Sequence, residues 1–174
     1  VYDKDVLDTY GVEKSPQEYW EDGKWDRDAL VDVITAIYDD SGASPVWGMT
    51  ATLTHMIRST FLTTGDPVVN IEKINADGTA EWSRGLDSAD TAEALTWLRN
   101  TLKANARYFN NGKQDWTVWK SHEPFVAGQT AMCLTKPEFL FGDIVLNVNN
   151  FGLTTWGGAD YNTMGGYYEN CYSV

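Results

Sequence analysis

Apolar residues recur at helical spacing along three long segments of the chain, and we predict that these segments are helices. The first begins at a cap on Asp26 and runs to about residue 40. Its predicted buried face consists of Leu30, Val33, Ile34, Ile37 and Tyr38. The second helix follows a turn at residues 45–48, and its predicted buried face consists of Leu53, Met56, Ile57, Thr60 and Phe61. The third is capped at Asp87–Ser88 and places Leu95, Leu98 and Leu102 on one side.

Shorter segments have the composition of strands and brief helices. Residues 1–7 predict a short strand that turns into a loop or brief helix near Gly11, and a second brief helix begins at Ser15–Pro16 and breaks at Gly23. Predicted strands over residues 68–74 and 79–82 flank Asn75-Ala76-Asp77-Gly78, which is a strong hairpin signal. Two further strands are predicted over residues 151–155 and 167–174. Helices that alternate with strands indicate an α/β domain.

One segment combines a helix end with a buried strand. A helix over residues 116–126 is predicted to bury Phe125, and Gly128 ends it in a conformation that other residues avoid. An apolar strand follows through Cys133, and a short helix over residues 137–141 comes after it. We therefore expect this segment to fix the position of the residues that follow the strand.

Charge and aromatic content narrow the possible partners. The net charge of −12 disfavours nucleic acids and anionic lipid surfaces, because both are themselves negative. No apolar run approaches the roughly 20 residues that a membrane-spanning helix needs. The chain holds 8 Trp, 9 Tyr and 6 Phe, which can form either stacking surfaces for sugars or an aromatic core.

Motifs of catalysis and metal binding are missing from the sequence. Cys133 and Cys171 are too few for a disulfide framework and lack metal-ligand spacing, and the sequence leaves open whether they pair. His55 and His122 are the only histidines. No zinc-protease, calcium-loop, phosphate-loop, dinucleotide or nucleophile-elbow pattern occurs. Nothing in the spacing of the many carboxylates singles out a glycosidase pair. We therefore expect no enzyme, no metal and no cofactor.

Four motifs, in this order along the chain, resemble family 1 of the bacterial extracellular solute-binding proteins, the maltose-binding type. Tyr2-Asp3-Lys4-Asp5 is similar to a tyrosine-asparagine-lysine strand, with Asp3 in place of the usual Asn. Residues 16–26 resemble a P-x-x-x-W-x-x-G-x-W segment, although Arg27 and Asp28 depart from its common W-T-W-D form. Residues 125–132 are similar to the F-x-x-G-x-x-A-M signature. Residues 151–153 resemble the strand before a proline-glycine loop that here lacks the proline.

The resemblance implies a periplasmic-binding-protein-like type II fold, in which two lobes close over a ligand. Residues 1–174 would then be a single domain, the second lobe alone with the first lobe absent. We expect a small, mostly parallel sheet flanked by helices. The implied function is capture of a solute outside the cell, by a periplasmic protein or a cell-surface lipoprotein, for the permease subunits of an ABC importer. The expected ligand is a sugar or oligosaccharide, and the expected state is a monomer.

Three groups of residues are candidates for ligand contact in such a lobe. Each also has a plainer interpretation: packing under a loop for Trp47, a solvated surface position for His55, an exposed ion pair for Lys136 and Glu138, and hinge packing for the tyrosines. Ser59 is expected on the same polar helix face as Thr52 and His55. The candidates are Trp47, Thr52 and His55; Lys136, Glu138 and Phe139; and Tyr167 and Tyr168.

Two rival functions stay open at this point. One is a solute-binding protein for a peptide, a polyamine or a metal complex, which an acidic cleft would favour. The other is a glycan-binding adhesion domain or a glycoside-acting domain, which turnover of a glycoside would reveal.

Overall fold

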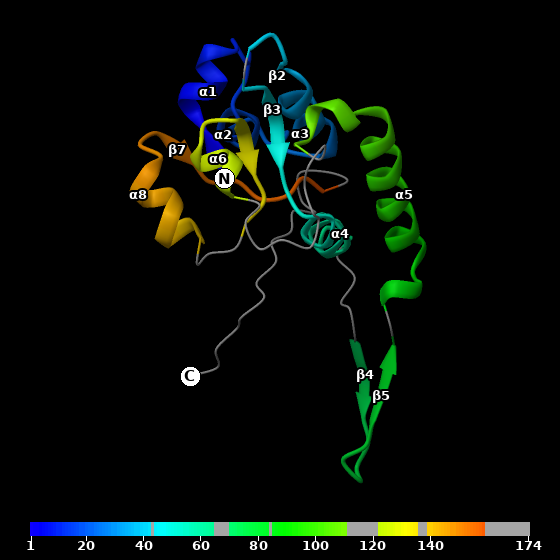
Figure 1. Ribbon diagram of the computed structural model, residues 1–174. Helices are drawn as coiled ribbons and strands as arrows, with labels where there is room; N and C mark the ends of the chain where they lie inside the picture. The colour runs from blue at the N-terminus through cyan, green and yellow to red at the C-terminus, as the bar shows by residue number, and fades with distance from the viewer. Residues whose placement is uncertain (43, 65–69, 84, 111–121, 136–138, 159–174) are drawn as a thin grey trace.

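A five-stranded sheet with helices packed around it forms the centre of the computed structural model, which describes residues 1–42, 44–64, 70–83, 85–110, 122–135 and 139–158 (Figure 1). The helices are α1 (Lys4–Thr9), α2 (Pro16–Glu21), α3 (Arg27–Thr35), α4 (Leu53–Leu62), α5 (Ala89–Ala104), α6 (Glu123–Val126) and α8 (Val145–Asn147). Short 3₁₀ segments span Gly85–Asp87 and Ala106–Tyr108, and a π-helical segment spans Leu140–Ile144. The strands are β1 (Tyr2–Asp3), β2 (Tyr38–Asp39), β3 (Val46–Thr50), β4 (Asn70–Ile74), β5 (Ala80–Ser83), β6 (Thr130–Cys133) and β7 (Phe151–Gly152).

The strand order of the main sheet is β2-β3-β6-β1-β7. β3 and β6 are parallel, with Met49 opposite Met132, whereas the pairs β2–β3, β1–β6 and β1–β7 are antiparallel. The α/β class and the small sheet with flanking helices are thus confirmed, but a mostly parallel order is wrong for the described strands. A short connection such as residues 40–45 between β2 and β3 allows only antiparallel pairing, because parallel neighbours need a long crossover.

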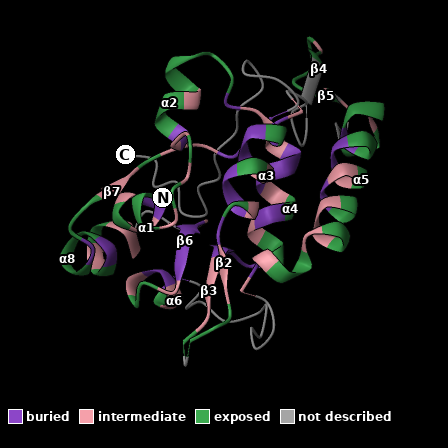
Figure 2. Cartoon of the chain, turned by 90° about the horizontal axis from the view of Figure 1, so that it is seen from above, coloured by how far each residue is buried: buried purple, intermediate pink, exposed green. Residues whose placement is uncertain are grey.

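The core lies on both sides of β6, whose four residues are all buried. On one side, Met132 joins a cluster built largely on Tyr2, Trp25 and the apolar face of α3. On the other side, Cys133 packs with Phe125 and Ile144. In Figure 2, buried positions lie along α3, α4 and β6, whereas much of α5 is exposed.

Most helix ends follow the predicted signals. Ser15 and Glu18 form a capping box at α2, Asp26 caps α3 and Ser88 caps α5. Gly128 has a φ of 68° and follows α6, as its place after Phe125 predicted. The predicted hairpin forms as β4 and β5, and it extends away from the main sheet in Figure 1.

The region between α3 and α4 differs from the prediction. The first long helix ends at Thr35, and Tyr38 lies in β2 opposite Trp47. The predicted turn at residues 45–48 is instead mostly β3, which begins at Val46. Tyr38 and Asp39 depart from the helical pattern because they pair with Trp47 and Val46 of β3.

The buried face of α4 is rotated from the prediction. Met56, Ser59, Thr60 and Phe61 are buried, whereas Leu53 and Ile57 are 38% and 41% exposed. The prediction that Leu53 and Ile57 face inward is therefore wrong, and so is the placing of Ser59 on a polar face. Hydrophobicity alone misplaces this face, because hydroxyl side chains can be buried when they form hydrogen bonds.

Three other predicted elements are described only in part. α6 covers Glu123–Val126, and residues 116–121 of the predicted helix lie outside the described residues. The helix predicted over residues 137–141 corresponds to a π-helical segment that begins at Leu140. β7 ends at Gly152 rather than at residue 155, and the strand predicted over residues 167–174 lies outside the described residues.

Candidate functional site

Three strands end at the same edge of the main sheet, which we call the α4 edge. β3 and β6 are parallel, and the backbone N–H of Leu134 donates to the Thr50 carbonyl at 3.0 Å. β7 points the same way as β6, since both run antiparallel to β1. Loops that follow parallel strands meet at one edge, which is where ligands of α/β sheets commonly bind.

The first turn of α4 lies at this edge. Thr52 follows β3 directly, and its hydroxyl accepts a hydrogen bond from the backbone N–H of His55 at 3.2 Å. Thr52 is buried by this capping role, and His55 is half-buried. Thr54 and Leu53 point to solvent beside them. The edge therefore offers a hydroxyl, an imidazole and an exposed apolar side chain within one helical turn.

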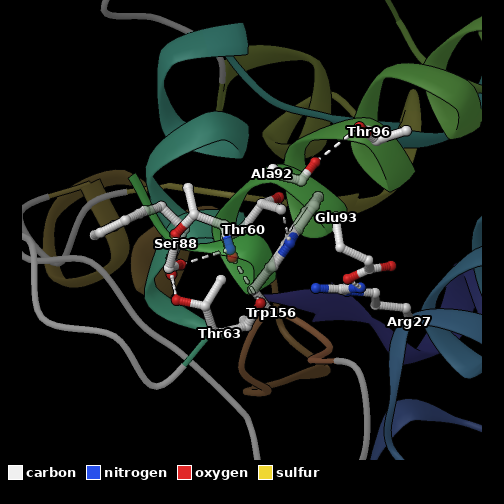
Figure 3. Close-up of polar contacts among 11 residues, drawn as sticks. Arg27, Thr60, Thr63, Ser88, Ala92, Glu93, Thr96 and Trp156 are labelled. Atoms are coloured by element: carbon white, nitrogen blue, oxygen red, sulfur yellow. Dashed lines mark hydrogen bonds and ion pairs between the residues drawn. The ribbon is translucent and has the colours of Figure 1, made fainter. Parts of the chain in front are cut away.

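A buried indole fixes α4 beneath this edge (Figure 3). The indole N–H of Trp156 donates to the Thr60 hydroxyl at 3.0 Å, and both side chains are buried. The Trp156 ring also meets Trp97 of α5 edge to face, with centroids 6.5 Å apart. These contacts join the loop after β7 to the later part of α4 and to α5.

Arg27 extends the same cluster toward α3. Its guanidinium lies 5.0 Å from the centre of the Trp97 ring, and Nη1 is 2.7 Å from Oε2 of Glu93 (Figure 3). The Arg27 side chain is 8% exposed and that of Glu93 is 63% exposed. The buried arginine therefore packs on the Trp97 ring and pairs its charge with the exposed carboxylate of Glu93 on α5.

The predicted site residues do not all meet at the α4 edge. Thr52 and His55 lie there together. Trp47 lies three residues before the end of β3, roughly 10 Å back along the strand at about 3.3 Å per residue. Trp47 pairs with Tyr38 and Thr130 near the opposite end of the strands, so the structure separates it from Thr52 and His55.

Phe139 belongs to a second cluster, which the sequence did not predict. Its ring stacks on His122 with centroids 4.2 Å apart and planes 16° apart. Nε2 of His122 lies 2.7 Å from Oδ2 of Asp143. Much of the Phe139 ring surface is therefore used in packing against His122. The other four candidates, Lys136, Glu138, Tyr167 and Tyr168, lie outside the described residues.

Sequence reasoning missed the exposed residues of the first turn of α4. The sequence pattern predicts a buried Leu53 and does not single out Thr54. The stripe Met56, Ser59, Thr60 and Thr63, with its i, i+3, i+4, i+7 spacing, could have shown that Ile57 lies off the buried face. No such signal exists for Leu53, which lies three residues before Met56 and is exposed at the first position of α4.

The chemistry that the described residues offer is hydrogen bonding and apolar contact. No group of three or more His, Cys, Asp or Glu side chains that could hold a metal occurs within the described ranges. Burial raises the pKa of the Cys133 thiol to about 12, so this thiol is not a nucleophile near neutral pH. In the part of the chain that the structure describes, no helix has the length and apolar character needed to cross a bilayer.

Comparison with known proteins gives one weak similarity. No family model matches the chain, and no curated protein matches it. Among solved structures, the chain is similar to an ABC substrate-binding protein from Listeria monocytogenes in complex with cycloalternan, with 21% sequence identity and a TM-score of 0.47. The similarity covers 76% of this chain and 30% of that chain, so this chain matches less than a third of the length of that protein.

Proposed function

We propose that this chain is one lobe of an extracellular solute-binding protein that captures a sugar or oligosaccharide for an ABC importer. The observation that carries the proposal is the α4 edge, where three strand ends meet the exposed first turn of α4. The motifs shared with family 1 solute-binding proteins support the same assignment. The proposed lobe has no cofactor, and its partners are the small-molecule ligand and the permease subunits.

The surface of the α4 edge suits a neutral, hydroxyl-rich ligand. Leu53 and Ile57 are four residues apart on α4 and both are more than a third exposed. Thr54 and His55 lie beside them. Sugar rings have apolar faces and a rim of hydroxyls, so apolar and hydrogen-bonding side chains in one turn match both parts. The net charge of −12 makes an anionic ligand unfavourable.

The proposed mechanism is closure of this lobe against a second lobe with the ligand between them. Closure would cover Leu53 and Ile57, which are apolar side chains exposed to water in this lobe. Half of the contacts would come from the second lobe. We therefore expect this chain alone to bind sugar weakly.

A titration followed by ¹⁵N–¹H NMR tests the proposal. Maltotetraose, cellotetraose and xylotetraose are added in turn to the labelled chain, with spermine and tetraalanine as non-sugar probes. We expect at least one sugar to shift the amide signals of residues 52–57 in a saturable way. Leu53→Ala should weaken that binding severalfold, and Leu86→Ala, an exposed leucine of the segment before α5, should leave it unchanged.

Three outcomes would overturn the sugar assignment. They are the absence of any sugar-dependent shift in residues 52–57, saturation of these residues by spermine or tetraalanine alone, and hydrolysis of a tetrasaccharide during the titration. The second outcome would favour a solute-binding protein for a cation or a peptide. The third would favour a glycoside-acting domain.

A further inference from the structure

A groove lies between α2, α1 and the segments on either side of β7, and we call it the α2 groove. It has two adjoining compartments that share Gln17 and Glu21. Their volumes are about 540 Å³ and about 330 Å³, within the range of ligand sites. The first compartment is lined also by Pro16, Trp20 and residues 153–155. The second is lined also by Lys4, Leu7, Asp8, Ser15, Glu18 and Asn150.

An exposed indole and an exposed leucine form the apolar part of the first compartment. Trp20 is 39% exposed although it is a large aromatic side chain, and Leu153 across the groove is 61% exposed. Exposed apolar side chains on both walls of one groove are a common feature of binding sites. A flat indole face is the surface on which a sugar ring stacks.

Hydrogen-bonding groups with fixed orientation occupy the middle of the groove. Nε2 of Gln17 donates to Oε1 of Glu21 at 2.9 Å, which aligns both side chains along α2. Oε2 of Glu18 accepts from the backbone N–H and the hydroxyl of Ser15, each at 2.7 Å. These contacts, the Ser15 backbone first, hold the pKa of Glu18 below its ordinary value, so its carboxylate is an acceptor at neutral pH.

The strand pair β1–β7 next to the groove is tightly packed. Tyr2 is fully buried and pairs with Gly152 in the sheet, and a Cβ at Gly152 would overlap the Tyr2 ring. Burial raises the pKa of Tyr2, the Glu18 and Glu21 carboxylates raise it further, and the Gln17 backbone lowers it in part. The side chain therefore stays neutral beneath α2. A site that is already formed loses less freedom when it binds a ligand.

We propose that the α2 groove is a second carbohydrate site, which binds a neutral oligosaccharide with one ring on Trp20 and the next beside Gln17 and Glu21. Two adjoining compartments suit a chain of linked rings better than one small molecule. The site lies next to the outer strand β7, and no residue of α4 lines it. It does not depend on the proposed function of the α4 edge.

The wall chemistry favours a neutral sugar over other ligands. Asp8, Glu18 and Glu21 outnumber Lys4 in the groove, so an anionic ligand would be repelled. One oxygen of Glu18 and one of Glu21 are already used by Ser15 and Gln17, which leaves oriented acceptors for ligand hydroxyls. A metal cation would instead need several carboxylates turned toward one point, and no such group of metal-ligating side chains occurs in the described residues.

The same NMR titration with maltotetraose, cellotetraose, xylotetraose, spermine and tetraalanine tests this site. We expect a tetrasaccharide to shift the indole N–H of Trp20 and the side-chain amide of Gln17 in a saturable way. Trp20→Ala should weaken that binding about tenfold, which is the loss of one good aromatic contact. Leu153→Ala should weaken it severalfold, and Leu146→Ala, an exposed leucine on α8 outside the groove, should not change it.

A charge variant separates a sugar from a cation. Glu21→Gln keeps a hydrogen-bond acceptor, so sugar affinity should stay within about threefold, whereas spermine affinity would fall strongly. Three results would overturn the proposal: no sugar shifts the Trp20 and Gln17 signals, spermine or tetraalanine alone saturates them, or Leu146→Ala and Leu153→Ala change affinity equally. The α4 edge and the α2 groove give separate signals in one spectrum, so each proposal can fail while the other stands.

Discussion

The hydrogen bond between Trp156 and Thr60 should be measurable as a coupling energy. Thr60 is fully buried and Trp156 is 4% exposed, so neither group has water as a substitute partner. Thr60→Val leaves the indole N–H without an acceptor and should cost about 1–3 kcal/mol of stability. Trp156→Phe leaves the hydroxyl without its donor and also removes ring contact with Trp97, so its cost should be larger.

A double-mutant cycle isolates the bond itself. Urea unfolding of the native chain, the two single variants and the double variant, followed by circular dichroism, gives four free energies of unfolding. We expect the cost of the double variant to be about 1 kcal/mol smaller than the sum of the single costs, because the second change removes a partner that is already lost. Trp20→Phe, at an exposed indole, should change stability by less than about 0.5 kcal/mol. A coupling energy within error of zero would refute the reasoning.

Three further outcomes follow from the geometry. Gly128→Ala should cost about 1–2 kcal/mol of stability because Gly128 has a φ of 68°. Gly142→Ala is the control: an added Cβ has no atom within 4 Å at either glycine, but Gly142 has no positive φ, so this change should not destabilise the fold. Equal costs of the two changes in urea unfolding would contradict the prediction. Ser88→Ala should cost about 1 kcal/mol through loss of the α5 cap, and an unchanged urea midpoint would contradict it. Burial raises the Cys133 pKa from 9.0 to about 12, so the stability that this neutral thiol contributes is present below about pH 9 and is lost as the pH rises through 12. In a Cys171→Ser background, Cys133 should react with a thiol reagent at pH 8 only after unfolding, and rapid labelling of the folded chain would show that the thiol is accessible.

The parts of the fold that local chemistry determines could be predicted from the sequence. The Ser15–Glu18 capping box, the Asp26 cap and the Gly128 stop each need only a few neighbouring residues, and each is present. The hairpin around Gly78 is of the same kind, with a φ of 82° at the glycine. The conformations of these caps and turns depend little on which distant residues pack against them.

Features that depend on distant partners were missed. The spacing of Tyr38 predicts a helix, but pairing with Trp47 in β3 determines its conformation. The polarity of Ser59 predicts a solvent-facing position, but the residue is buried in α4. In the candidate site, Thr52 and His55 share a helical turn that the sequence could predict, whereas the distance of Trp47 from them follows from the direction of β3.

The loop over residues 153–156 connects the two proposed sites, because it lines the α2 groove and is bonded to α4. The Thr155 carbonyl accepts from the indole N–H of Trp25, and Trp156 donates to Thr60 of α4, so the end of the loop is bonded to the core at consecutive residues. Leu153 at the start of the loop is exposed in the α2 groove. A loop held in this way has little freedom to rearrange when a ligand binds, so both sites should be largely preformed and the ordering cost of binding should be small. The same two bonds make the loop sensitive to changes in the core: a substitution that frees Trp156 would affect Leu153 three residues away, although it touches neither ligand.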